Sequence, residues 1–260
     1  MRSCSIAVGF VFLLAACAAP RADAPRWGNT RAEVAAVLAR PGRDAKDLER
    51  DARDHPAETL GLLGVARGMR VLDVFSGGGY YAELAARVVG ESGRAVAHNN
   101  RAYLSFAGKA LETRLAARPL PQLERADREI EALGFAGEFD VAILVMAYHD
   151  AYWTPKPEEG EWTVTREPLM HALWTALRQG GRLLVVDHAA VAGTGSAAAQ
   201  ELHRIDEAFA RADFERAGFR LVASSDALRN SSDPRTTNVF DPAARGTTDR
   251  FAFVFEKPSR

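Results

Sequence analysis

The sequence predicts an α/β protein with a doubly wound, Rossmann-like sheet, mostly parallel, and helices on both faces. Apolar runs of strand length alternate with amphipathic stretches of helix length, and glycines separate them. The strongest runs, such as residues 139–146, are almost continuously apolar, which is typical of strands covered on both faces. Hydrophobic residues form 47% and charged residues 26% of the chain, a composition that excludes disorder as the main state.

The helices and strands are predicted from the spacing of apolar residues and from the residues that begin or end helices. Val34, Val37 and Leu38 share one helical face, and Pro41-Gly42 ends that helix, while Asp54 is expected to cap the helix that contains Pro56. Helices are expected at residues 31–39, 46–53, 56–63, 80–89, 103–117, 168–177 and 197–217. Strands are expected at residues 70–75, 94–98, 122–126, 139–146, 182–187, 219–224 and 251–255. This pattern predicts N-terminal helices in residues 31–55 and one main domain in residues 56–260.

The N-terminus is predicted to be an export signal. An apolar run at residues 6–16 is shorter than the roughly twenty residues that span a bilayer, and it fits the core of a signal peptide. Residues 14–17, Leu-Ala-Ala-Cys, resemble the lipobox of bacterial lipoproteins. The resemblance implies a signal peptide at residues 1–16, a lipid on Cys17 and a tether at residues 17–30. It implies an exported, membrane-anchored protein on the periplasmic side, in the outer membrane where the cell has one. The alternative is a plain signal peptide cut near Ala19.

The charge and the cysteine content argue against nucleic-acid binding and against cysteine-dependent sites in the main domain. Thirty-three Lys and Arg residues are interspersed with thirty-four Asp and Glu residues, which gives a net charge of −1 and no electrostatic case for nucleic-acid binding. The only cysteines are Cys4 and Cys17, so the main domain has no disulfide, no cysteine-based zinc site and no thiol nucleophile.

A glycine loop at residues 76–79 is the clearest chemical signal. It lies between an expected buried strand and an expected helix, where glycines let the backbone approach a ligand and the helix N-terminus attracts an anionic group. The alternative is a tight turn without a ligand. Gly77-x-Gly79-x-x-Ala82 also satisfies the dinucleotide fingerprint, but Asn99 and Asn100 stand where that fingerprint places an acid.

The wider pattern resembles the class I S-adenosylmethionine-dependent methyltransferases. Residues 71–80, Val-Leu-Asp-Val-Phe-Ser-Gly-Gly-Gly-Tyr, are similar to the first motif of that family, with Asp73 as its acid and Phe75 in place of its first glycine. Similar matches continue at residues 93–99, 138–143, 177–183 and 211–219, and cover roughly residues 56–257. The lipobox and the final Asp-Arg-Phe-Ala-Phe-Val-Phe-Glu-Lys-Pro together resemble a group of exported bacterial predicted methyltransferases.

This resemblance implies S-adenosylmethionine as the cofactor and an antiparallel last strand. By position it implies that the cofactor is held by Asp73, Ser76, Gly77, Gly78, Gly79, Tyr80, Asn99, Asn100 and Asp127. It also places the methyl acceptor after the strand at residues 139–146.

Candidate catalytic residues follow two expected strands. His149 is a candidate base, Asp150 either orients it or caps the next helix, and His188 follows the strand at residues 182–187. Residues 151–167 form an insertion that is either a lid or a solvated surface. His203 and Asp206 share one face of the expected helix at 197–217, but two ligands are too few, so no metal site is predicted.

Three functions remain open. The first is a methyltransferase that acts on a small molecule. The second is a ligand-binding module on the same fold, which Phe75 and Asn99 favour. The third is an NAD(P)-dependent oxidoreductase, which the missing ribose acid disfavours. The only membrane contact expected is the lipid anchor.

Overall fold

The computed structural model describes residues 30–156 and 162–259. The predicted signal peptide, the predicted lipidation site Cys17 and most of the predicted tether lie outside the described residues. No described helix is both long and apolar enough to cross a membrane.

The described elements are close to those that the sequence predicts. The helices are α1 (Arg31–Leu38), α2 (Ala45–Asp54), α3 (Pro56–Leu63), α4 (Tyr80–Val89), α5 (Arg101–Ala117), α6 (Arg166–Ala176), α7 (Ala198–Leu202) and α8 (Glu207–Arg216), with 3-10 turns η1 (Ile130–Ala132) and η2 (His149–Tyr152). The strands are β1 (Arg70–Val74), β2 (Arg94–Asn99), β3 (Leu123–Asp127), β4 (Phe139–Val145), β5 (Leu177–His188), β6 (Arg220–Ser225) and β7 (Arg250–Glu256).

The seven strands form a single sheet in the order β3-β2-β1-β4-β5-β7-β6. The neighbours from β3 to β5 are parallel, and β7 runs antiparallel to both β5 and β6. The predicted fold class, with its antiparallel last strand, is therefore confirmed.

The strand register brings several loops to one edge of the sheet. Val74 of β1 pairs with His98 of β2 and with Leu144 of β4, and Val145 pairs with Val186 of β5. The carboxyl ends of β1, β2, β4 and β5 therefore lie together, with the start of β7 beside them. In open α/β sheets this is the edge where ligands bind.

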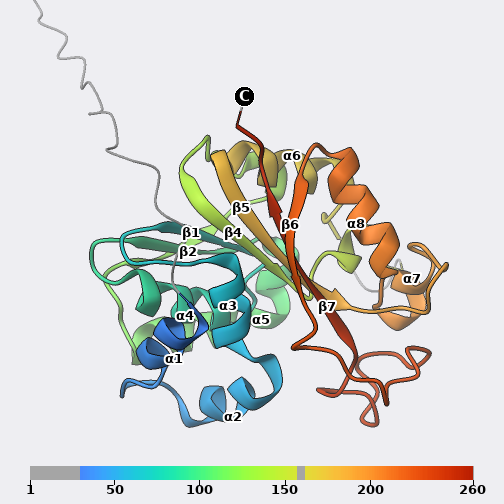
Figure 1. Cartoon of the computed structure of the whole chain (residues 1–260), viewed down its shortest axis with the longest axis horizontal. Helices are drawn as coiled ribbons and strands as arrows, with labels where there is room; N and C mark the ends of the chain where they lie inside the picture. The colour runs from blue at the N-terminus through green and yellow to red at the C-terminus, as the bar shows by residue number, and fades with distance from the viewer. Residues whose placement is uncertain (1–29, 157–161, 260) are drawn as a thin grey trace, which may run out of the picture.

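Helices cover both faces of the sheet (Figure 1). Apolar side chains of α1, α3 and α4 pack on one face, against strand residues such as Val71, Ile143 and Leu184. Side chains of α6 and α8 pack on the other, against Leu72, Leu144 and other strand residues that alternate with the first set. Burial on both faces explains the nearly continuous apolar runs.

Two expected local features are wrong. The predicted helix at residues 197–217 is two helices, because His203 takes a left-handed conformation (φ 52°) that ends α7, and Asp206 accepts hydrogen bonds from Ala208 N and Phe209 N and so caps α8. Asp54 does not cap α3. It is the last residue of α2, and the left-handed His55 (φ 41°) separates the two helices.

Asp54 instead anchors the N-terminal helices to β7. Its carboxylate, only 1% exposed, accepts hydrogen bonds from Arg250 Nη1 at 2.8 Å and Arg50 Nε at 2.5 Å. Burial opposes its charge, but Arg50 and Arg250 outweigh burial and hold the pKa of Asp54 below its usual value. The Asp54–Arg250 ion pair joins segments that lie far apart in the sequence.

We expect Asp54→Asn to lower the free energy of unfolding at pH 7 by about 3 kcal/mol, because it leaves the buried Arg250 uncompensated. Since the folded pKa lies below the unfolded one, the stabilisation is present above about pH 4 and fades as the pH falls through the folded pKa. Urea denaturation at pH 7 and at lower pH measures both effects. The control is Asp226→Asn, which removes a highly exposed partner of Arg229. Equal losses in the two variants would contradict the anchoring role.

Candidate functional site

The backbone conformation of the glycine loop, and its packing against α5, favour glycine in this loop. Gly77 (φ 55°) and Gly79 (φ 80°) take left-handed conformations that favour glycine. A side chain at Gly79 would also lie 2.6 Å from Leu111 Cδ1 on α5. Arg114, from the same helix, donates a hydrogen bond from Nε to Gly78 O at 2.6 Å. The loop is therefore held in one shape by α5, while Ser76, Gly77 and Gly78 stay partly exposed.

Phe75 keeps the backbone geometry expected of a glycine. It takes a left-handed conformation (φ 54°), which costs a residue with a Cβ roughly 1–2 kcal/mol. Its ring is buried and stacks on Tyr103, with ring centroids 4.7 Å apart. Aromatic burial offsets the backbone cost, so the substitution preserves the path of the loop but fills space beside it.

Asn99 is the last residue of β2 and contacts the glycine loop, and Asn100 follows it. The Asn99 side chain accepts from Gly77 N at 2.9 Å and donates to Gly77 O at 3.0 Å and Ser76 Oγ at 3.3 Å. Asn100 Oδ1 caps α5 by accepting from Tyr103 N, and its Nδ2 donates to Thr163. Both amides are fully buried and bind protein atoms.

The other three residues predicted to hold the cofactor, Asp73, Tyr80 and Asp127, have different surroundings. Asp73 is buried beneath the loop, and its Oδ2 has no hydrogen-bond partner among the residues that the structure describes. Burial raises the pKa of Asp73 to about 8, so this carboxyl is largely protonated at pH 7. The Tyr80 hydroxyl donates to Asp51 on α2 at 2.6 Å, and the exposed Asp127 pairs with Arg125.

The predicted catalytic residues come together at the ends of β4 and β5. His149 begins the turn η2, and its Nδ1 lies 2.7 Å from Oδ1 of Asp187 near the end of β5. Asp187 Oδ2 also accepts from His149 N at 2.8 Å, and its Oδ1 accepts from His188 N at 2.7 Å. Asp187 is fully buried, so one carboxylate fixes both histidines at this edge.

The two histidines have opposite electrostatic surroundings. Burial opposes a charge on His149, but the carboxylates of Asp187 and Asp150 outweigh it and raise its pKa to about 9. Burial, together with His149 and Arg250, lowers the pKa of His188 well below its usual value. Despite its burial, Asp150 keeps a lowered pKa because of His149, His203 and Tyr103. At pH 7 His149 is protonated, Asp150 is ionised and His188 is neutral. His149 is therefore a hydrogen-bond donor at this pH and not the base that its position in the sequence predicts.

These groups open into a cavity of about 410 Å³, here called the main cavity. It is lined by Tyr103, Phe106, Met146, His149, Asp150, Trp153, Trp162, His188, His203, Val239 and Phe240. Phe106 and Phe240 are 66% and 60% exposed, which is unusual for large apolar side chains that belong to a folded core. An apolar pocket with a few convergent polar groups is the common form of a small-molecule site.

Three further residues belong to this site: Tyr103 is not predicted from the sequence, Asp187 is not predicted as a site residue, and His203 is considered there only as a partner of Asp206. Tyr103 donates from its hydroxyl to Asp150 Oδ2 at 2.5 Å, Asp187 holds both histidines, and His203 lies 3.8 Å from Asp150 Oδ1. Asp187 had a signal, since it is a charged residue at the end of an apolar strand and directly precedes His188. The other two positions depend on tertiary packing.

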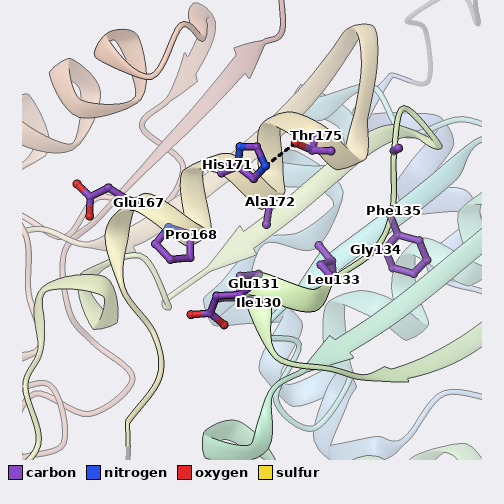
Figure 2. Close-up of a pocket in the computed structure, with 11 residues that line it drawn as sticks. Ile130, Glu131, Leu133, Gly134, Phe135, Glu167, Pro168, His171, Ala172 and Thr175 are labelled. Carbon is purple, nitrogen blue, oxygen red and sulfur yellow. Dashed lines mark hydrogen bonds between the residues drawn. The ribbon is translucent and has the colours of Figure 1, made fainter.

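A second cavity, of about 570 Å³, lies between α6 and the segment that joins β3 to β4 (Figure 2). Its lining is mainly apolar, with Glu131, Glu167 and the exposed His171. His171 Nε2 lies 3.5 Å from Thr175 Oγ1, and Figure 2 draws this interaction. This cavity does not involve the glycine loop or the carboxyl ends of β4 and β5.

One family model and many solved structures are similar to this chain. The model of the protein-L-isoaspartate(D-aspartate) O-methyltransferase (PCMT) family matches residues 52–118, which include the glycine loop. No curated protein matches the sequence significantly.

Among solved structures, a SAM dependent methyltransferase from Aquifex aeolicus is 15% identical, covers 88% of this chain and 99% of its own, and has a TM-score of 0.56. A putative methyltransferase, solved in complex with the Haloferax volcanii Trm112 methyltransferase activator, is 18% identical, with coverages of 89% and 99% and a TM-score of 0.55. The [4+2]-cyclase SpnF is 16% identical, with coverages of 88% and 93% and a TM-score of 0.52. At these identities the similarity establishes the Rossmann-like methyltransferase fold.

Proposed function

We propose that this protein is an S-adenosylmethionine-dependent methyltransferase whose acceptor is a small molecule bound in the main cavity. One observation carries the proposal. The methyltransferase strand order places the glycine loop after β1 and the His149 cavity after β4, on adjacent strands of one sheet edge. The PCMT family match over the glycine loop supports the same cofactor.

The loop fits this cofactor in several respects. Ser76, Gly77 and Gly78 offer partly exposed backbone without bulky side chains, and α4 begins behind them with no side-chain cap. Asn99 fixes the loop through Gly77. We propose that these loop residues hold the cofactor, which supplies an electrophilic methyl group on a sulfonium when bound.

The cavity residues have distinct proposed roles. His149, held by Asp187 and protonated at pH 7, positions the acceptor by donating a hydrogen bond. His188 is neutral and offers an imidazole that accepts a hydrogen bond. Phe106, Trp153 and Phe240 exclude water and favour an acceptor with a ring or other flat apolar group. Hydrogen bonds to the two histidines and contacts with the aromatic side chains align the acceptor for in-line attack on the methyl group.

The test is methyl transfer from labelled S-adenosylmethionine to a panel of aromatic hydroxyl, thiol and amine compounds. We expect His149→Ala to lower turnover about 100-fold or more and to change cofactor affinity less than about threefold, because His149 contacts the acceptor side. His171→Ala, which replaces an exposed histidine of α6 outside the main cavity, is the matched control. Equal turnover in both variants would remove His149 from the proposed mechanism.

A ligand-binding module without the cofactor is the second candidate. Asn99 directs its amide into the protein rather than toward a ligand, and the Phe75–Tyr103 stack occupies space beside the loop. SpnF, with the same fold, is named for a cyclase activity, so the fold alone does not determine the reaction. An NAD(P)-dependent oxidoreductase has less support, because the antiparallel β7 departs from the typical dinucleotide-binding sheet. Export and lipidation at Cys17 remain proposals that rest on the sequence.

A further inference from the structure

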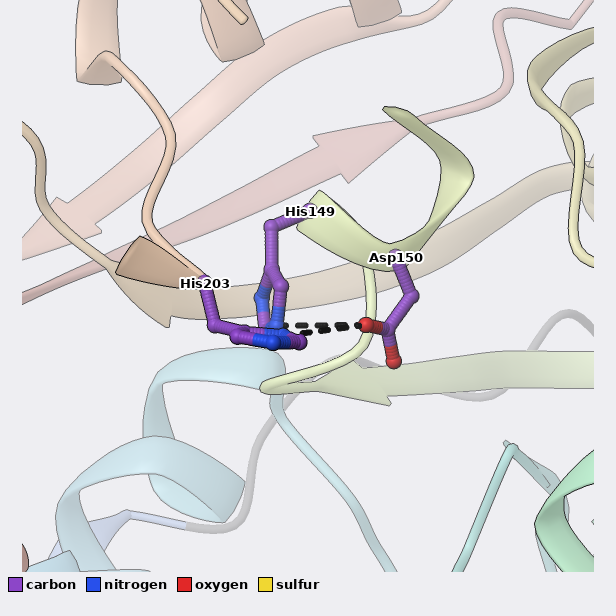
Figure 3. A group of neighbouring side chains, drawn as sticks. All are labelled: His149, Asp150 and His203. Carbon is purple, nitrogen blue, oxygen red and sulfur yellow. Dashed lines mark ion pairs between the residues drawn. The ribbon is translucent and has the colours of Figure 1, made fainter. Parts of the chain in front are cut away.

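We propose that His149, Asp150 and His203 form a binding site for a divalent transition-metal ion, of which zinc is the simplest probe. One potential ligand atom from each residue lies within 4.8 Å of the other two. His149 Nε2 is 3.3 Å and His203 Nδ1 is 3.8 Å from the same oxygen, Oδ1 of Asp150. Figure 3 shows the two imidazoles converging on this carboxylate from different elements.

Hydrogen bonds from outside the cluster orient two of the three ligands. Asp187 Oδ1 is 2.7 Å from His149 Nδ1, which directs Nε2 toward the cluster. Tyr103 donates to Oδ2 of Asp150, which leaves Oδ1 facing the histidines. Carboxylates that hold the second nitrogen of a ligating histidine are typical of metal sites, because they fix the ring and its tautomer.

His203 supplies an independent observation. Its Nδ1 is buried and makes no hydrogen bond in the described part of the chain, since Oδ1 of Asp150, with which it forms an ion pair, is 3.8 Å away. Its ring packs against Phe240, with centroids 4.8 Å apart, and Trp153, at 5.8 Å, and its backbone is held in a left-handed conformation at the end of α7. The separation of His203 Nδ1 from Oδ1 of Asp150 is too long for a hydrogen bond, and a metal ion between the nitrogen and the carboxylate would satisfy both.

The ligand types indicate the class of ion. Two imidazole nitrogens and one carboxylate oxygen suit Zn²⁺, Fe²⁺, Co²⁺ or Ni²⁺ better than Mg²⁺ or Ca²⁺, which prefer oxygen. All three residues line the main cavity. Three protein ligands beside a cavity leave a position open, as in catalytic rather than structural zinc sites. The open position would take a small molecule with an anionic oxygen or a thiolate. The ion would take the place of the proton on His149 Nε2, so metal binding and the hydrogen bond proposed from protonated His149 are alternative states of this site. The inference therefore does not depend on methyl transfer.

The experiment is a titration of the chelator-treated chain, in a Cys4→Ser, Cys17→Ser background, with Zn²⁺ against a chromophoric competitor. We expect one ion per chain, with Kd below about 1 µM, and at least a 100-fold loss of affinity in His203→Gln and in Asp150→Asn. His171→Gln is the matched control and should bind as tightly as the parent chain.

Circular dichroism establishes that each variant is folded. Cobalt substitution gives a second readout, since its visible absorption should change in the parent chain and not in His203→Gln. Absence of stoichiometric binding would overturn the proposal and leave a simple His149–Asp150 ion pair. Binding that survives both His203→Gln and Asp150→Asn would overturn it as well, because the ion would then lie elsewhere.

Discussion

Replacing Gly77 with Leu is expected to weaken S-adenosylmethionine binding by about 100-fold or more while the protein still folds. The nearest atom to a Cβ at this position is Ala107 Cβ, at 4.0 Å, so the protein itself has room for the first carbon. A longer side chain would occupy the space along the loop where the backbone must meet the cofactor. The left-handed conformation (φ 55°) adds a strain of roughly 1–2 kcal/mol.

The control separates strain from blocked binding. Gly137 has a similar conformation (φ 65°) and lies before the start of β4, away from the loop, with no atom within 4 Å of the point that a Cβ would occupy. Gly137→Leu should therefore show a similar loss of stability and unchanged binding. Calorimetric titration and urea denaturation of both variants measure the two quantities. Equal cofactor affinity in the two variants would exclude the glycine loop as the binding site.

Removing the Asp187 carboxylate should cause the second large effect. Asp187→Ala leaves three hydrogen-bond donors without their acceptor, namely His149 N, the His149 ring and His188 N. Because this carboxylate is fully buried, we expect the free energy of unfolding to fall by about 3–5 kcal/mol.

The conservative variant Asp187→Asn keeps the shape and one acceptor oxygen, so it should fall between Asp187→Ala and the parent chain. Asp127→Ala, which removes an exposed partner of Arg125, should change stability by less than about 1 kcal/mol. Urea denaturation followed by circular dichroism gives all three values. A loss below about 1 kcal/mol in Asp187→Ala would show that the carboxylate is not the anchor of the two histidines.

Much of the fold can be predicted because its signals are local. Apolar periodicity locates the seven described strands, six of them to within about a residue at each end, whereas β5 begins at Leu177, five residues before the predicted start. The glycines after β1 mark a loop in which Gly77 and Gly79 have positive φ angles. The predicted helix at residues 197–217 is wrong because its break depends on the left-handed His203, a conformation that no neighbouring residue type signals.

The candidate site can be predicted only in part, since it is assembled from distant segments. His149, Asp150 and His188 are predicted from their position after strands, and the structure places all three on the main cavity. The roles of Tyr103 and His203 depend on the packing of α5 and α7 against η2, which spacing along the chain does not reveal. Asn99 is predicted as a cofactor-binding residue after the second strand, but its hydrogen bonds to Gly77 depend on the loop conformation, which the sequence does not show.

The most direct test of the proposed function is calorimetric titration of the full chain with S-adenosylmethionine, with NAD as the control. The proposed function predicts binding of S-adenosylmethionine in the micromolar range and none of NAD, with the binding lost in Gly77→Leu and kept in Gly137→Leu. Absence of S-adenosylmethionine binding to the folded parent chain would contradict it. That result would mean that Phe75 and Asn99 close the cofactor site, and that the main cavity serves another ligand.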